Sequence, residues 1–192
     1  MRVSEDMTSL LKAAKAGDND AFTLLVKAYE DRVYSLAYYV TKNHHDAQDV
    51  AQEVFLKLWR ALPSYRGDAA DVWIMKIAKN TCLDHIKQKK RIEPLEYEID
   101  GERAERPIPD TDVQSNPPEA AVQHERIQAV ARAMMRLSDE HREILTLRYV
   151  NGLSYEQLQR VLDVGEGTVK SRLSRAKKSL KKILKSGNVF DG

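Results

Sequence analysis

Apolar residues recur at steps of three and four along most of the chain, with polar residues between them. This spacing matches the 3.6-residue turn of an α-helix, whereas the two-residue alternation of strands does not persist anywhere. Start and stop signals such as Gly17 and Pro63 divide the pattern into separate helices. In the first half of the chain we expect helices over residues 8–16, about 20–41, 46–62 and 71–91. The sequence therefore predicts an all-α fold.

A proline-rich segment interrupts this pattern. Residues 103–118 contain four of the six prolines and few side chains that a core would bury, which is typical of a linker. A chain of 192 residues is also about long enough for two small cores. We therefore predict two small helical domains on either side of a linker. Their bounds are 1–92 for the first domain, 93–119 for the linker, 120–187 for the second domain and 188–192 for a short tail.

The second domain contains a pair of helices with clear local signals. Ser154 and Gln157 form a capping box, and Leu153 in front of the cap can pack on Leu158, so a short helix begins directly after Ser154. A break with two glycines follows, and then a second helix over residues 166–184. Two helices joined by a tight turn form a helix-turn-helix, whose second helix enters the major groove of DNA.

This second helix has an apolar face and a cationic face. The apolar stripe consists of Val169, Leu173, Ala176, Leu180 and Ile183. Lys and Arg on the other face suit phosphates and, near the helix N-terminus, base edges. The candidate DNA-binding residues are Thr168, Lys170, Ser171, Arg172, Ser174, Arg175 and Lys178. A solvated lysine-rich surface is the alternative, but the preceding capped helix and turn favour DNA binding.

The helix over residues 71–91 repeats this arrangement with a cationic face of its own. The loop in front of it combines an aromatic residue, an Arg and a Gly, a composition that suits bases unstacked from DNA. The candidate residues of this second DNA-binding surface are Tyr65, Arg66, Asp68, Trp73, Lys76, Lys79 and Asn80. Taken alone, aromatic residues such as Tyr65 and Trp73 more often belong to a hydrophobic core or its rim.

The helix over residues 46–62 has an acidic edge instead. Its candidate residues are Asp46, Asp49, Gln52, Glu53 and Leu56. Because such an edge repels phosphate, we expect this helix to dock against a protein partner. A solvated polar face is the alternative reading.

Charge and composition narrow the function further. Residues 1–91 carry a net charge of +3, residues 92–125 a net charge of −8, and residues 126–192 a net charge of +7. Two basic modules that face a polyanion, separated by an acidic spacer, would produce this distribution. The single cysteine, Cys82, excludes an internal disulfide. We expect no metal and no cofactor, and no constellation of catalytic groups favours an enzyme.

Taken together, these segments resemble one family, the extracytoplasmic-function group of bacterial RNA polymerase sigma factors. Residues 46–56 (DAQDVAQEVFL) look like the segment that grips the β′ subunit of polymerase. Residues 73–84 (WIMKIAKNTCLD) look like the helix that recognises the −10 promoter element. LSYEQ at 153–157 and GTVKSRL at 167–173 look like the helix-turn-helix that recognises the −35 element. The resemblance runs from about residue 20 to residue 184.

The resemblance implies a role for each surface and a set of partners. It assigns the acidic edge to core RNA polymerase, the loop and helix before residue 92 to the −10 element, and the recognition helix to the −35 element. The partners would be the β′ and β subunits of polymerase, promoter DNA and an anti-sigma factor. A chain without an apolar leader or a membrane span would act in the cytoplasm. The alternative is a helix-turn-helix repressor or activator that works without binding core polymerase.

Overall fold

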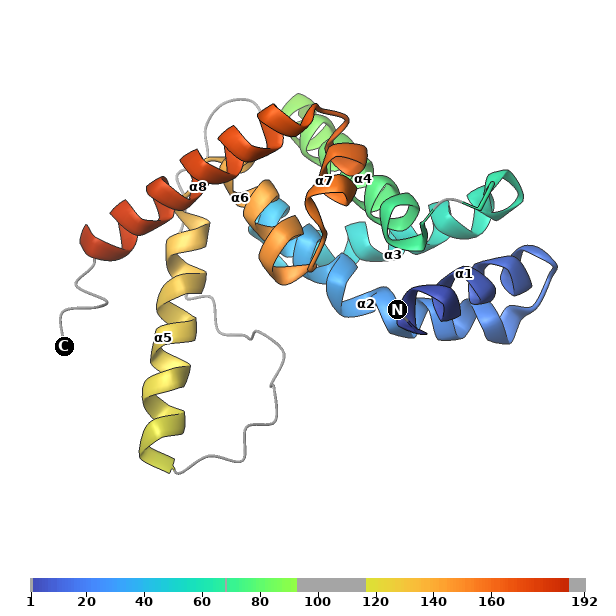
Figure 1. Ribbon diagram of the computed structural model, residues 1–192, viewed down its shortest axis with the longest axis horizontal. Coiled ribbons are helices and arrows are strands. Elements are labelled where there is room, and N and C mark those ends of the chain that lie inside the picture. The colour runs from blue at the N-terminus through green and yellow to red at the C-terminus, as the bar shows by residue number, and fades with distance from the viewer. Residues whose placement is uncertain (1, 68, 93–116, 187–192) are drawn as a thin grey trace.

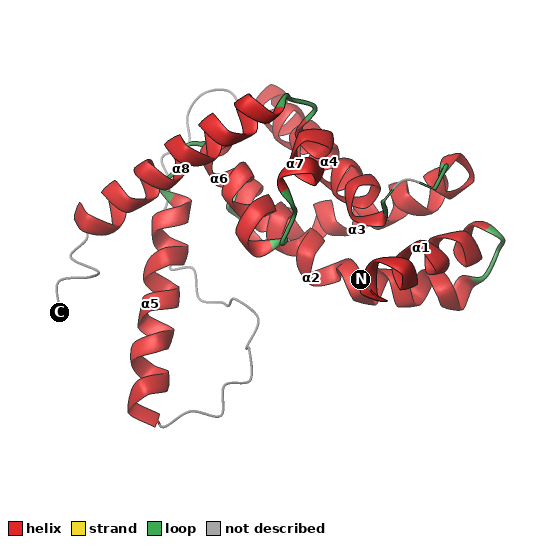
Figure 2. Cartoon of the chain, viewed as in Figure 1, coloured by secondary structure: helices red, strands yellow, loops and turns green. Residues whose placement is uncertain are grey.

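The computed structural model describes residues 2–67, 69–92 and 117–186. Every regular element among these residues is helical, as Figure 2 shows, and the all-α prediction is confirmed. The α-helices are α1 (Arg2–Lys15), α2 (Asn19–Thr41), α3 (His44–Ala61), α4 (Ala70–Ile92), α5 (Pro117–Met135), α6 (Asp139–Leu145), α7 (Tyr155–Leu162) and α8 (Glu166–Ser186). A short 3-10 helix, η1 (Leu62–Ser64), follows α3, and a π-helical segment, η2 (Thr146–Val150), follows α6.

Helices α1 to α4 form a first module, which comprises residues 2–92. Gly17 adopts a φ of +99°, a left-handed conformation that glycine tolerates best, and it separates α1 from α2. The Asp18 side chain accepts a hydrogen bond from the backbone N of Ala21 and caps α2; the sequence allowed either Asp18 or Asp20 as this cap. Helix α3 begins at His44, two residues earlier than predicted, because Asn43 caps it.

Helices α5 to α8 form a second module, which comprises residues 117–186. Ser154 and Gln157 make both hydrogen bonds of the capping box, and Leu153 and Leu158 are fully buried beside them. Asp163 ends α7 in a left-handed conformation, with a φ of 57°, and α8 begins three residues later. The helix-turn-helix predicted from the sequence is therefore present as α7 and α8.

A buried arginine fixes the corner between α5 and α6. The guanidinium of Arg142 is completely buried, and it donates to the carbonyl oxygens of Met135 and Leu137 at 3.2 and 2.9 Å. It also pairs with Asp139 in the first turn of α6. These bonds satisfy carbonyls at the end of α5 that would otherwise lack partners.

The two modules pack directly against each other. Helix α7 lies along α4, and α6 and η2 lie against α2, as Figure 1 shows. Buried side chains of both modules belong to one continuous apolar core. Helix α5, in contrast, projects away from this body (Figure 1). The sequence predicted the two modules but contained no signal for the contact between them.

Candidate nucleic-acid and partner interfaces

Helix α8 presents a cationic surface to solvent. Val169, Leu173 and Ala176 are buried against the rest of the second module, as the apolar stripe predicts. The exposed residues on the other side include Lys170, Ser171, Ser174, Arg175 and Lys178. An i,i+4 ion pair joins Lys170 to Glu166 over 2.5 Å in the first turn. The side chains that could read base edges therefore point outward.

Two of the predicted DNA-binding residues of α8 are less accessible. Arg172 lies at the edge of the helix, where its Nε contacts a carboxylate oxygen of Glu140 over 2.8 Å. Thr168 is half-buried, and its carbonyl oxygen accepts a hydrogen bond from the Ser171 hydroxyl. In this arrangement Arg172 ties α8 to α6 and does not point into solvent with the other cations.

The predicted residues of α4 divide into exposed and covered groups. Lys76 and Asn80 are exposed, and so is Arg66 in the loop before the helix. Lys79 is half-buried, and its Nζ lies 3.5 Å from the carbonyl oxygen of Val161 in α7. The second module therefore covers one of the cations on this surface. Asp68 lies outside the described residues.

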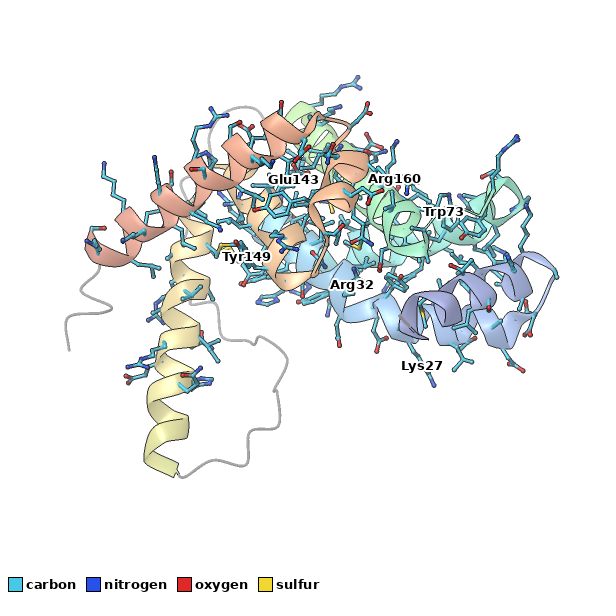
Figure 3. The ribbon with its side chains drawn as sticks, in the orientation of Figure 1. Lys27, Arg32, Trp73, Glu143, Tyr149 and Arg160 are labelled. Carbon is cyan, nitrogen blue, oxygen red and sulfur yellow. The ribbon has the colours of Figure 1, made fainter. Side chains whose placement is uncertain are left out.

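The two aromatic residues next to this surface form a pair. Tyr65 is only 2 % exposed, and its ring lies against that of Trp73, with 5.0 Å between the centroids. Trp73 is half-buried and borders the surface (Figure 3). Tyr65 therefore supports Trp73 from inside the core, and in this conformation its ring is not free to stack on a base.

The acidic edge of α3 is open to solvent along most of its length. Asp49, Gln52, Glu53 and Leu56 are all exposed. Asp46 is different, because Lys89 and His85 of α4 reach its carboxylate over 2.8 and 3.7 Å. Asp46 therefore links α3 to α4, and its carboxylate is less available to a partner protein than those of Asp49 and Glu53.

Two large exposed apolar side chains continue this edge, and only one of them, Leu56, is among the residues predicted from the sequence. Trp59 is 43 % exposed and lies one turn beyond Leu56, which is 55 % exposed. Large exposed apolar side chains beside a charged rim are typical of protein interfaces. The signal was in the sequence, since both residues fall outside the buried stripe of α3, which consists of Ala47, Val50, Ala51, Val54 and Leu58.

Four polar residues link the modules, and we call them the junction cluster: Arg32, Asp71, Asn151 and Gln157. Arg32 donates from Nη1 to Asp71 Oδ1 over 2.5 Å and from Nη2 to the carbonyl oxygen of Asn151 over 2.8 Å. Asn151 donates from Nδ2 back to the carbonyl oxygen of Arg32, also over 2.8 Å. Gln157 Nε2 lies 3.3 Å from Asp71 Oδ2. No local pattern along the chain singles out Arg32 or Asn151.

Asp71 is the most heavily hydrogen-bonded carboxylate of this junction. Burial alone would raise its pKa, but the hydrogen bonds from Arg32, Tyr29 and Gln157, with the charge of Arg32, hold the pKa below its usual value. Asp71 is therefore ionised at neutral pH and keeps its partners in place.

A second carboxylate near the junction has the opposite shift. Burial raises the pKa of Glu143, although the nearby charges of Lys79 and Arg172 oppose this. Figure 3 shows Glu143 where the two modules meet. This carboxylate acts on one candidate DNA-binding cation from each module.

Other kinds of site find little support in the described parts of the chain. No group of three potential metal ligands occurs among those residues. Cys82 is 1 % exposed, and burial, with a smaller effect from Glu143, raises the pKa of its thiol to about 12. A hollow of about 400 Å³ between α3 and α4 is lined mainly by polar and charged side chains, among them Lys57, Arg60 and Asn80. None of the helices searched is both long and apolar enough to span a membrane.

The fold and the cationic face of α8 define a DNA-binding protein of the helix-turn-helix class. The Sigma-70 region 2 family matches residues 25–92, and the Sigma-70 region 4 family matches residues 127–180. The chain belongs to the sigma-70 family of RNA polymerase sigma factors, in its extracytoplasmic-function (ECF) group.

Relatives of known name match almost the whole chain. The RNA polymerase sigma-H factor of Pseudomonas aeruginosa is 36 % identical, and the match covers 96 % of both chains. The ECF sigma-E factor of Escherichia coli K12 is 36 % identical over 93 % of this chain and 95 % of its own. The ECF sigma factor SigW of Bacillus subtilis is 31 % identical over 91 % and 95 %. The protein is a sigma factor, an initiation factor and not an enzyme, that binds core RNA polymerase and directs promoter-specific transcription.

Solved structures share the fold. CnrH in complex with the cytosolic domain of CnrY superposes with a TM-score of 0.67 at 21 % identity, over 94 % of this chain and 98 % of that chain. RpoE from Bartonella quintana, in complex with the anti-sigma factor NepR, gives a TM-score of 0.61 at 22 % identity, over 85 % and 96 %. At this level of identity the likeness concerns the fold alone.

Proposed function

We propose that the three surfaces divide the work of promoter recognition. The α8 surface reads the −35 element, the exposed face of α4 with its preceding loop binds the −10 element, and the acidic edge of α3 docks on core polymerase. The observation that carries this proposal is the outward cationic face of α8, placed behind a capped helix and a tight turn. Such a helix fits the major groove.

Within α8 the contacts differ along the helix. Ser171, Ser174 and Arg175 lie in its first half, where they can approach base edges, and Arg contacts to guanine are the commonest specific contacts. Lys170 and Lys178 provide charge for phosphates. Arg172 and Thr168 support this surface from its edge.

For the −10 element we propose Lys76, Asn80 and Arg66 as direct contacts, because all three are exposed. Trp73 borders this surface and offers an aromatic face to an unstacked base. Tyr65 holds Trp73 in position from behind. Lys79 can contact the same DNA strand only when α7 does not cover it.

For core polymerase we propose Asp49, Gln52, Glu53, Leu56 and Trp59. An exposed Trp beside Leu56 supplies apolar area at the centre of an interface, while the carboxylates around it select a basic partner. Asp46 holds the edge in position through Lys89.

We further propose that the protein works in the cytoplasm and is held by an anti-sigma factor. The first point follows from the site of RNA polymerase action. The second is supported by the complex of the Bartonella factor with its anti-sigma factor. A repressor or activator that acts without core polymerase is not favoured, because the relatives of known name are sigma factors.

Run-off transcription tests the proposal directly. Purified core polymerase is incubated with genomic promoter fragments, with and without the protein. We expect defined transcripts only when the protein is present. Repression or activation of transcription from promoters that already carry another sigma factor, with no new start sites, would indicate the alternative regulator.

A further inference from the structure

Helix α8 contains one acidic residue, at the end that enters the major groove in a helix-turn-helix. Its 21 residues include eight Lys and Arg and a single acid, Glu166, which is the first residue of the helix. The N-terminal residues of a recognition helix are the ones that contact base edges. A carboxylate at this end weakens the attraction of the helix to phosphate. Its place therefore indicates a role in selecting a sequence and not in attracting DNA.

The turn before α8 leaves this carboxylate as the anion at the start of the helix. The carbonyl oxygen of Gly165 accepts hydrogen bonds from the backbone N of Thr168 and Val169 over 3.0 and 3.1 Å, so Gly165 is the N-cap and has no side chain to offer. A helix N-terminus favours an anion and commonly binds phosphate. Glu166 places its own negative charge there and repels the DNA backbone. Base edges are then the remaining groups that this end of α8 can meet.

An ion pair within α8 holds the carboxylate in place. Lys170 Nζ lies 2.5 Å from Glu166 Oε1, and both side chains are exposed. Because the pair is exposed, it adds little to the stability of the fold. The hydrogen bond from Lys170, with its charge, lowers the pKa of Glu166, so the carboxylate is ionised at neutral pH. The pair engages Oε1, and an ionised carboxylate accepts further hydrogen bonds through Oε2.

The chemistry of the base edges decides what such a carboxylate selects. An ionised carboxylate can only accept hydrogen bonds, so it needs an edge that donates. In the major groove cytosine presents its N4 amino donor, whereas guanine presents two acceptors and thymine an acceptor and a methyl group. Adenine has an amino donor too, but its N7 acceptor lies beside it. Cytosine is therefore the base that Glu166 favours.

We propose that Glu166 is a specificity-determining residue of the −35 surface: its Oε2 accepts a hydrogen bond from the N4 amino group of one cytosine, while Lys170 holds the carboxylate through Oε1. This inference rests on the proposed assignment of α8 to the −35 element. The same carboxylate rejects guanine and thymine at that position. Arg175 lies about two and a half turns further along α8, so it meets a different base pair.

Transcription by the holoenzyme from mixed templates tests this reading. Core polymerase with the full-length chain transcribes variants of one promoter that the run-off assay identifies. The templates differ at one −35 base pair at a time, and each gives a transcript of its own length. Glu166→Gln removes the charge and keeps the length of the side chain. Glu30→Gln removes one charge from an exposed position of α2 and is the control.

The wild type should prefer cytosine at one −35 position by about tenfold, the usual size of a good base contact. In Glu166→Gln this preference should fall to about twofold or move to adenine, whose donor and acceptor match an amide. Transcription from the other templates should rise, because a negative charge near DNA is gone. Glu30→Gln should keep the wild-type profile. The same base preferences in Glu166→Gln and the wild type overturn the inference.

A second variant identifies which strand is read. A preference for cytosine on one strand is also a preference for guanine on the other, and a lysine can read guanine. Lys170→Gln should keep the cytosine preference and reduce the salt dependence of promoter binding by about one contact. If Lys170→Gln removes the preference and Glu166→Gln keeps it, the lysine is the reader and the inference is wrong.

Failure of the proposed function gives a different result. If transcription by the wild type is the same for every −35 template, α8 does not read this element at all, and the proposed function falls with the inference. If Arg175→Ala relaxes discrimination at one base pair while Glu166→Gln leaves every preference unchanged, α8 reads the −35 element and only the role of Glu166 is overturned.

Discussion

Gln157 of α7 donates a hydrogen bond from Nε2 to Oδ2 of Asp71 in α4, over 3.3 Å, while its Oε1 accepts from the backbone N of Ser154 over 2.8 Å. One amide thus caps a helix of the second module and reaches a carboxylate of the first. Only an amide can do both, since the cap needs an acceptor and Asp71 needs a donor.

The first prediction separates these two roles. Gln157→Glu keeps an acceptor for the capping box but sets two carboxylates against each other, so it should open the junction and leave α7 intact. Gln157→Ala should lose both and cost the helix about 1 kcal/mol in addition. Circular dichroism measures the loss of helix. Alkylation of Cys82, which is buried in α4 and feels the charge of Glu143 in α6, measures the opening of the junction. Equal alkylation rates for Gln157→Glu and wild type would contradict the assignment.

The second prediction concerns acid. Because the pKa of Asp71 is lower in the folded chain than in the unfolded one, its contribution to stability is present above about pH 4 and is lost as pH falls through the folded value. Denaturant unfolding between pH 7 and pH 3 should show this loss in the wild type. In Asp71→Asn it should be smaller. Parallel curves for the two proteins would exclude Asp71 as the titrating group.

The third prediction has the opposite sign. Burial raises the pKa of Glu143, so the folded chain binds this proton more tightly than the unfolded chain, and stability from this group rises as pH falls. Glu143→Gln, which is neutral at every pH, should therefore raise the Tm at pH 7, and the gain should shrink in acid. A lower Tm at pH 7 would mean that attraction to Lys79 and Arg172 outweighs burial.

The fourth prediction distinguishes base reading from charge attraction on α8. Arg175→Ala should cost about 1 to 3 kcal/mol on the cognate −35 sequence and relax discrimination at one base position. Lys181→Ala, about one and a half turns further along, should weaken all sequences alike and reduce the salt dependence by about one contact. Competition binding with single-base −35 variants measures both. A uniform loss for Arg175→Ala would make it a phosphate contact.

The fifth prediction concerns core polymerase. Charge reversal in Asp49→Lys with Glu53→Lys should abolish co-elution with the core enzyme and leave the helical content unchanged. Glu30→Lys with Asp31→Lys makes the same change of charge at exposed positions of α2 and should bind normally. If both double variants co-elute like the wild type, the acidic edge is a solvated surface.

Much of the fold could be read from local signals. The capping box at Ser154 and the choice between Asp18 and Asp20 as the cap of α2 depend on a few neighbouring residues, so the sequence places the starts of α2 and α7 to within about one residue. The start of α3 was misplaced because Asn43 competes with Asp46 as the N-cap, and sequence alone does not rank them.

The residues of the candidate surfaces were harder to predict from the sequence, because the exposure of a side chain depends on which elements pack against it. Periodicity places Tyr65 only in a loop, whereas its burial depends on contact with Trp73. Likewise, Arg32 looks like any cation on a helix. Its partners lie 39 and 119 residues away along the chain, beyond the reach of any local pattern.

The contacts of the buried Arg142 and those of Asp71 respond differently to acid. Its bonds to the carbonyls of Met135 and Leu137 contain no group that titrates at moderate pH, since the guanidinium keeps its proton. The junction between the modules, in contrast, depends on the Asp71 carboxylate. Acid below about pH 4, where Asp71 begins to take up its proton, should therefore separate the modules first and leave the α5–α6 corner folded, as two successive transitions and not one.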